Sequence, residues 1–183
     1  MRFRWATQPK RSFDDLLAEH IKDYQGLLNR LTLDVGVTGW SKAWKICIWA
    51  RLQEGERAYK LLGEFIKNNV YPNLWGYHPP FQIDCNFGYA AGVCEMLVQS
   101  HMGVVDLLPA LPKAWPAGTV RGLRVRGGFE VDIEWQDGKL VQAVVKGLSN
   151  EPGLCSARYR KGACTFSLAK GESRVLQAGD FRQ

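Results

Sequence analysis

The sequence lacks the patterns by which several classes of protein are recognised. No apolar run approaches the roughly 18 residues that a membrane-spanning helix needs. The N-terminal residues MRFRW are basic but lack the apolar core of a secretory signal. Although the formal net charge is +6, no four Lys or Arg residues are consecutive. We therefore expect neither a membrane nor a nucleic acid as partner, and we attribute the charge to a solvated surface.

The cysteines form no recognisable metal or redox motif. Their number is odd, and no two of them have the C-x-x-C spacing of zinc ribbons and thioredoxin-like proteins. We interpret them as small buried hydrophobes or free thiols, and we predict no metal and no cofactor. They are Cys47, Cys85, Cys94, Cys155 and Cys164.

The first half of the chain has helical periodicity. Apolar residues recur every three or four positions in residues 12–33, 40–52 and 58–70, which predicts three helices. The second and third are separated by a turn at residues 54–56, so we expect them to pack antiparallel. Four tryptophans crowd this region: Trp40, Trp44, Trp49 and Trp75. They favour either helix packing or a sugar-binding cleft, in which aromatic rings stack on pyranose faces, and both interpretations stay open.

The second half changes to the alternation typical of strands. Residues 119–126 alternate apolar with basic side chains, and residues 129–135 alternate apolar with acidic ones. Asp137-Gly138 predicts a tight hairpin turn before a return strand at 140–145. Further strands are expected near 156–160, 164–168 and 174–177. The fold class predicted is α+β, with N-terminal helices followed by a small antiparallel β-sandwich.

One loop combines titratable side chains with rigidity. Residues 78–88, HPPFQIDCNFG, place His78 and Asp84 six positions apart in a proline-stiffened segment. An apolar helical pattern follows from 87 to 101. Such a loop at a helix N-terminus suits ligand positioning. In the alternative interpretation, Asp84 or Asn86 simply caps the helix.

These segments together resemble glycoside hydrolase family 95. The resemblance rests on TGWSKAWK at 38–45, WARL at 49–52, residues 78–88, LLPALP at 107–112 and residues 127–135. Enzymes of that family are α-L-fucosidases that act on terminal α-1,2-linked fucose, and some act on galactose. The likeness covers nearly all of residues 37–183.

The resemblance implies a division into three parts. Residues 1–36 would be a helical linker, 37–104 a remnant of an (α/α)6 barrel, and 105–183 the C-terminal β-sandwich. The family's N-terminal β-domain and most of its barrel have no counterpart in these residues. Two or three helical hairpins cannot close a barrel of six, so an exposed apolar face could promote homo-oligomerisation.

The resemblance also assigns roles to individual residues. Asp84 corresponds to the family's catalytic aspartate on the base side of an inverting site, and His78 to a sugar-binding histidine. Trp40 is the aromatic candidate for substrate binding. Cys85 replaces the usual glycine, so that its side chain could narrow the site or strain the loop.

None of the segments that resemble the family contains its general acid. In the family the general acid is a glutamate on a barrel segment without counterpart here, and the spacing of Glu54, Glu56, Glu64 and Glu95 supports none of them as a substitute. We expect a truncated glycosidase-like chain with impaired or no activity, whose partner is a fucosylated oligosaccharide. Its own status as an enzyme is left open. The alternatives are a non-catalytic carbohydrate-binding or interaction module and a gene fragment without function.

Overall fold

The computed structural model describes residues 38–77 and 82–182. Internal contacts divide the chain into two units, residues 1–35 and 36–183, and the second of these contains all described residues. The predicted helix at 12–33, the linker at 1–36 and His78 lie outside the described residues.

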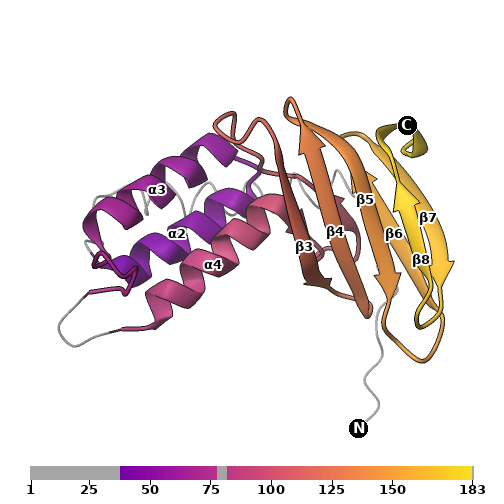
Figure 1. The fold of residues 1–183 in the computed structure, drawn as a ribbon, viewed down its shortest axis with the longest axis horizontal. Coiled ribbons are helices and arrows are strands. Elements are labelled where there is room, and N and C mark those ends of the chain that lie inside the picture. The colour runs from indigo at the N-terminus through magenta and orange to yellow at the C-terminus, as the bar shows by residue number, and fades with distance from the viewer. Residues whose placement is uncertain (1–37, 78–81, 183) are drawn as a thin grey trace, which may run out of the picture. The chain divides into compact units, whose positions relative to one another are not determined.

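Three helices form the first part of the described chain (Figure 1). They are α2 (Gly39–Arg51), α3 (Gly55–Asn68) and α4 (Asp84–Leu97). Helix α2 begins where the Thr38 hydroxyl accepts a hydrogen bond from the Ser41 amide. It ends at Arg51, and two positions later the φ of 61° at Gln53 turns the backbone left-handed. Both predicted helices in this region are confirmed, and α3 begins inside the segment that was expected to be a turn.

The contacts between α2 and α3 show the relative direction of these two helices. A Cβ atom at Gly39, the start of α2, would lie 3.1 Å from the ring of Phe65, near the end of α3. At the opposite end, the Arg57 guanidinium lies 4.4 Å from the centre of the Trp49 ring. Helices α2 and α3 are therefore antiparallel, as the short turn predicts. No helix among the described residues is long and apolar enough to cross a membrane.

Helix α4 packs parallel to α2 through small residues. A Cβ atom at Gly39 would lie 3.0 Å from that of Cys85 at the start of α4, and one at Gly88 would lie 2.8 Å from that of Ala43. Near the other end, a Cβ atom at Gly92 would lie 2.5 Å from Cγ2 of Ile46. The two backbones therefore approach closely along their whole length, with equivalent ends together.

The expected continuation of this helix to residue 101 is wrong. At Val98 the backbone becomes extended, and β1 (Val98–Gln99) pairs with β2 (Val105–Leu107). The apolar residues from 96 to 98 are buried in both elements, so periodicity alone does not separate a buried helix end from a buried strand.

The strands form two four-stranded sheets. One has the order β1-β2-β6-β7 and the other β3-β4-β5-β8. The remaining strands are β3 (Gly118–Val125), β4 (Phe129–Gln136), β5 (Lys139–Gly147), β6 (Gly153–Tyr159), β7 (Gly162–Leu168) and β8 (Ser173–Leu176). The α+β class is confirmed. One detail departs from the expected antiparallel sandwich, because β2 and β6 pair in parallel.

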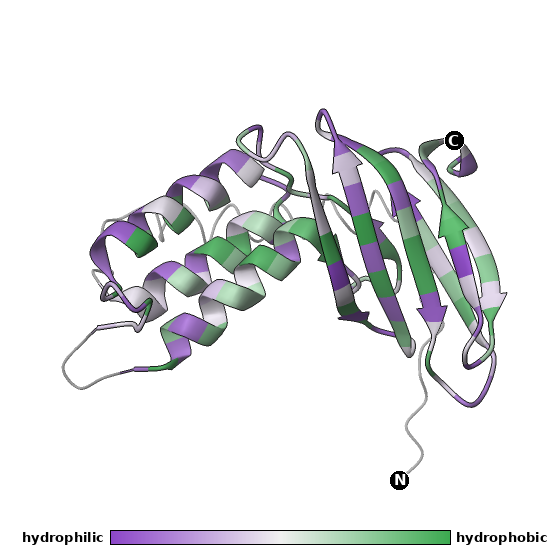
Figure 2. Cartoon of the chain, viewed as in Figure 1, coloured by the Kyte–Doolittle hydropathy of each residue, from purple (hydrophilic) through white to green (hydrophobic). Residues whose placement is uncertain are grey.

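The alternation read from the sequence matches the burial of the strands. In β4 every second residue is buried, which gives the banded colouring of the central strands in Figure 2. Asp137 and Gly138, both with positive φ, form the expected two-residue turn between β4 and β5. On the outer face Arg124 pairs with Glu130 at 3.1 Å, as the opposite charges of the two strands predict.

Candidate functional site

The start of α4 shows that the capping interpretation of Asp84 and Asn86 is wrong. The N-cap residue is Ile83, and its position has no side-chain capping bond. Asp84 is the first helical residue and is solvent-exposed. Among the described residues its carboxylate has no hydrogen-bond or ion-pair partner. A negative charge in the first turn is favourable there, because it faces the positive end of the helix dipole.

Asn86 anchors the loop before α4 to the helix. Its Oδ1 atom accepts a hydrogen bond from the Gly76 amide at 3.0 Å, and its Nδ2 atom donates one to the Leu74 carbonyl at 2.7 Å. Within the loop, the Tyr71 amide donates to the Trp75 carbonyl at 2.8 Å. This role of Asn86 could not be read from the sequence, because both of its partners are backbone groups ten and twelve positions away.

The side chain of Cys85 is buried in the protein. Its side chain is 3% exposed, and its thiol donates a hydrogen bond to the Gln82 carbonyl at 3.1 Å. A Cβ atom at Gly76 would lie only 2.0 Å from its sulfur, so the thiol fills the space beside that glycine. Cys85 is helical and has no positive φ, so its own backbone conformation is one that a non-glycine residue adopts readily.

The tryptophans divide between packing and exposure. Trp49 is buried, as the packing interpretation predicts. Trp40 and Trp44 are 48% and 43% exposed and stack on each other, with ring centres 6.3 Å apart and planes 17° from parallel. Trp75, in the loop held by Asn86, is 50% exposed. Exposed aromatic faces of this kind are the surface that a sugar ring can cover.

The parallel packing of α2 and α4 brings two of the predicted site residues to one end of the helix pair. Trp40 follows Gly39, which contacts Cys85, the residue after Asp84. Trp40 and Asp84 thus lie on the first turns of neighbouring helices. The third predicted residue, His78, lies outside the described residues.

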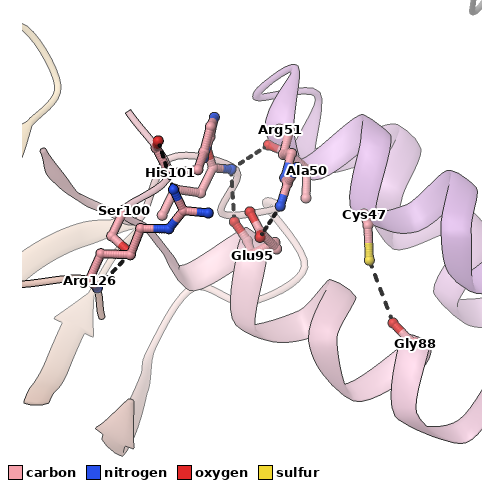
Figure 3. Close-up of polar contacts among 9 residues, drawn as sticks. Cys47, Ala50, Arg51, Gly88, Glu95, Ser100, His101 and Arg126 are labelled. Carbon is pink, nitrogen blue, oxygen red and sulfur yellow. Dashed lines mark hydrogen bonds and ion pairs between the residues drawn. The ribbon is translucent and has the colours of Figure 1, made fainter. Parts of the chain in front are cut away.

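A separate polar network lies at the other end of the same helices (Figure 3). Arg51 Nη2 pairs with Glu95 Oε1 at 3.0 Å. The side-chain nitrogen Nε2 of Gln99 donates hydrogen bonds to the backbone carbonyls of Ala50, at 2.7 Å, and Glu95, at 2.9 Å. These bonds tie the last turn of α2 to the junction of α4 and β1.

This location removes Glu95 as a catalytic partner of Asp84. The two residues are eleven positions apart on one helix, an axial distance of about 16 Å at 1.5 Å per residue. The carboxyl groups of an inverting pair are roughly 6.5–9.5 Å apart. Glu95 also has a structural role already, as the partner of Arg51.

The described cysteines are poor candidates for nucleophiles, and the described residues offer no metal site. Burial raises the pKa of Cys47, Cys85, Cys94 and Cys164, and raises that of Cys155 to about 11. A thiol with a raised pKa is a poor nucleophile at neutral pH. Within the described ranges, no three His, Cys, Asp or Glu side chains gather so as to hold a metal ion.

Comparison with known families matches both halves of the chain. Residues 35–97 match the glycosyl hydrolase family 95 catalytic domain, and residues 99–180 match the glycoside hydrolase family 95 C-terminal domain. The two matches meet where α4 ends and β1 begins. They define the chain as glycoside hydrolase sequence, part of a catalytic domain followed by a C-terminal domain. The chain belongs to glycoside hydrolase family 95.

Individual relatives agree with this assignment. The chain is 47% identical over 116 residues to alpha-L-fucosidase 2 of Arabidopsis thaliana, over 57% of this chain and 14% of that protein. It is 37% identical over 126 residues to probable alpha-fucosidase A of Aspergillus niger, over 61% of this chain and 16% of the relative. The corresponding protein of Aspergillus oryzae is 38% identical over 130 residues, 61% of this chain and 18% of that protein. The chain thus spans less than a fifth of the length of these relatives.

Proposed function

We propose that this chain contributes the base side of a fucosidase active site. The substrate would be a glycan with a terminal α-1,2-linked fucose, and the reaction an inverting hydrolysis. One observation carries the proposal: the exposed carboxylate of Asp84, which has no partner among the described residues, and the exposed Trp40–Trp44 stack occupy the same end of two parallel helices. Residues 37–104 would form part of the barrel, residues 105–183 the β-domain, and residues 1–36 a linker.

The chemistry follows from an inverting mechanism. Asp84 would accept a proton from a water molecule as that water attacks the anomeric carbon, while an acid on the opposite side protonates the leaving oxygen. Trp40 would hold the apolar face of the sugar ring. Its exposure leaves the indole surface available for that contact.

We further propose that the 183-residue polypeptide by itself has little or no hydrolytic activity. Glu95 is too far from Asp84, Glu54 lies near Arg57 at the start of α3, and Glu56 accepts a hydrogen bond from the Lys113 amide. Without a general acid, the rate falls by about 10²–10⁴-fold. The alternative function, non-catalytic carbohydrate binding, is favoured by the same exposed tryptophans and predicts binding without turnover.

Thermal unfolding with and without L-fucose tests the proposed site. A ligand that binds only the folded chain stabilises it by RT ln(1 + [L]/Kd), about 1.4 kcal/mol at ten times Kd, so the midpoint temperature should rise. D-fucose, which has the same composition and the mirror-image shape, should give no comparable shift. Trp40→Ala should remove the effect of L-fucose, because the stacking surface is lost. Equal shifts with both enantiomers, or none with L-fucose, would contradict the proposal.

A further inference from the structure

We propose that the chain has a second saccharide-binding site, in a pocket distant from Asp84. The pocket has a volume of about 510 Å³ and lies where the α2–α3 turn, residues 108–116 and two hairpin turns of the β-strands converge. Ligand pockets commonly have volumes of 300–1,000 Å³. The choice of a saccharide as ligand rests on the proposed glycosidase function, whereas the pocket itself does not.

Hydrogen bonds to three neighbouring elements hold the wall of the pocket that residues 108–116 form. The Ala110 amide donates to the Met96 carbonyl at 3.1 Å, and the Lys113 amide donates to Glu56 Oε1 at 2.7 Å. The Gly138 amide donates to the Pro116 carbonyl at 2.8 Å. The wall at 108–116 is thus tied to α4, to α3 and to the β4–β5 turn, so the pocket is formed before a ligand arrives. Preformed walls reduce the entropy lost on binding.

The lining offers both an aromatic wall and polar groups of both kinds. Trp115 is partly buried, and Tyr59 contacts its ring edge-on, with ring centres 5.8 Å apart. Around it, Lys113 and Arg160 supply hydrogen-bond donors, Asp137 supplies acceptors, and the Gln53 amide supplies both. None of the three charged side chains has an ion-pair partner among the residues that the structure describes.

This combination fits a saccharide better than other small ligands. A sugar hydroxyl donates and accepts hydrogen bonds, and the apolar face of the ring stacks on an indole. A simple anion would favour donors alone and would be repelled by Asp137. A purely apolar ligand would displace water from the charged groups of Lys113, Asp137 and Arg160 without replacing its hydrogen bonds, which is unfavourable.

The backbone of several pocket-lining residues has positive φ angles, which also supports a ligand site here. Of the five non-glycine residues with positive φ among those described, four line this pocket: Gln53, Leu108, Asp137 and Arg160. The helix end explains Gln53, and the two-residue hairpin turns explain Asp137 and Arg160. Leu108 and Arg160 are residue types that seldom adopt this conformation. Strained residues cluster where a structure positions side chains for ligands.

The pocket is separate from the proposed fucosidase site. Gln53 follows the C-terminal end of α2, whereas Trp40 and Asp84 lie at the N-terminal ends of α2 and α4. Helix α2 has 13 residues, so the two ends are about 20 Å apart. One monosaccharide cannot contact both places, and substitutions in one site can be made without touching the other.

Titration of the ¹⁵N-labelled chain with 2′-fucosyllactose, followed by NMR, tests the proposal at residue level. The amides of Lys113 and Gly138 and the indole of Trp115 should shift together along one binding curve. The double variant Lys113→Gln/Arg160→Asn should weaken that binding about tenfold or more, since two charged donors are lost. Asparagine tolerates the left-handed backbone at position 160 better than most residues, so this variant is expected to fold.

Two further variants separate this site from its surroundings. Lys161→Gln removes a neighbouring cation of the same hairpin turn that does not line the pocket, and it should leave the affinity unchanged. Asp84→Asn should also leave the pocket shifts unchanged, while shifts near residues 84–86 report the proposed fucosidase site independently. The inference is overturned if only those latter shifts occur, if the double variant binds like the wild type, or if inorganic phosphate alone reproduces the shifts at Lys113 and Gly138.

Discussion

Asp106→Asn is expected to lower the free energy of unfolding by about 3–5 kcal/mol, because it breaks the largely buried ion pair that Asp106 forms with Arg158. The two residues are register partners in the parallel β2–β6 pair, and their side chains are only 9% and 14% exposed. Gln53 Nε2 also approaches Asp106 Oδ2, at 3.4 Å. Burial raises the pKa of the Asp106 carboxyl, and the bond to Arg158 opposes that rise.

Urea unfolding monitored by circular dichroism measures this effect. Removing both charges together, in Asp106→Leu/Arg158→Met, should be far less damaging than the single change, since no unpaired charge remains buried. Arg124→Ala serves as the matched control: it breaks an ion pair with Glu130 in which the arginine is 68% exposed, and it should cost about 1 kcal/mol or less. An Asp106→Asn variant as stable as the Arg124→Ala variant would show that the buried pair is unimportant.

Gly92→Val should destabilise the chain by about 3 kcal/mol or more and separate the two parallel helices. A Cβ atom there would lie 2.5 Å from Cγ2 of Ile46, nearer than atoms approach without displacement. Overpacking of this kind typically costs about 1–3 kcal/mol, and the two further methyl groups of valine raise the expected cost. Because α2 and α4 hold Trp40 and Asp84 at one end, the stabilisation by L-fucose should also decrease.

Gly63→Val provides the comparison for this change. Gly63 lies in the interior of α3, and nothing is found within 4 Å of a Cβ atom at that position. Valine has a somewhat better helix propensity than glycine, so this variant should unfold at the same urea concentration as the wild type or a slightly higher one. Equal losses in the two variants would mean that contact between α2 and α4 does not decide the outcome.

The parts of the fold that could be predicted from sequence are those encoded by neighbouring residues. The alternation in β4 and the Asp137-Gly138 turn specify a hairpin locally, and the structure has it. The parallel pairing of β2 with β6 could not be read in the same way, because about fifty residues separate the two strands. The end of α4 was missed for a related reason: residues 96–98 are buried whether helical or extended.

For the candidate site, the sequence indicates residue types and spacing but not how the side chains are placed. The types and spacing of residues 78–88 pointed to the loop before α4, and the exposure of Trp40 agrees with the sugar-binding interpretation. The roles of Asn86 and Cys85 depend on the distant backbone of residues 74–76, which no local pattern reports. The placement of Asp84 and Trp40 at the same end of the helix pair likewise depends on the parallel packing of α2 and α4.

The most direct test of the central proposal is hydrolysis by a chimaera. Residues 35–180 of this chain, which match the catalytic and C-terminal domain models of the family, would replace the corresponding part of these two domains in alpha-L-fucosidase 2 of Arabidopsis thaliana. Fucose release from 2′-fucosyllactose would then be measured. We predict that the chimaera is active and that Asp84→Asn lowers its kcat by at least about 100-fold, with thermal stability unchanged. A folded chimaera whose activity is indifferent to Asp84→Asn would contradict the assignment of Asp84 as the catalytic base.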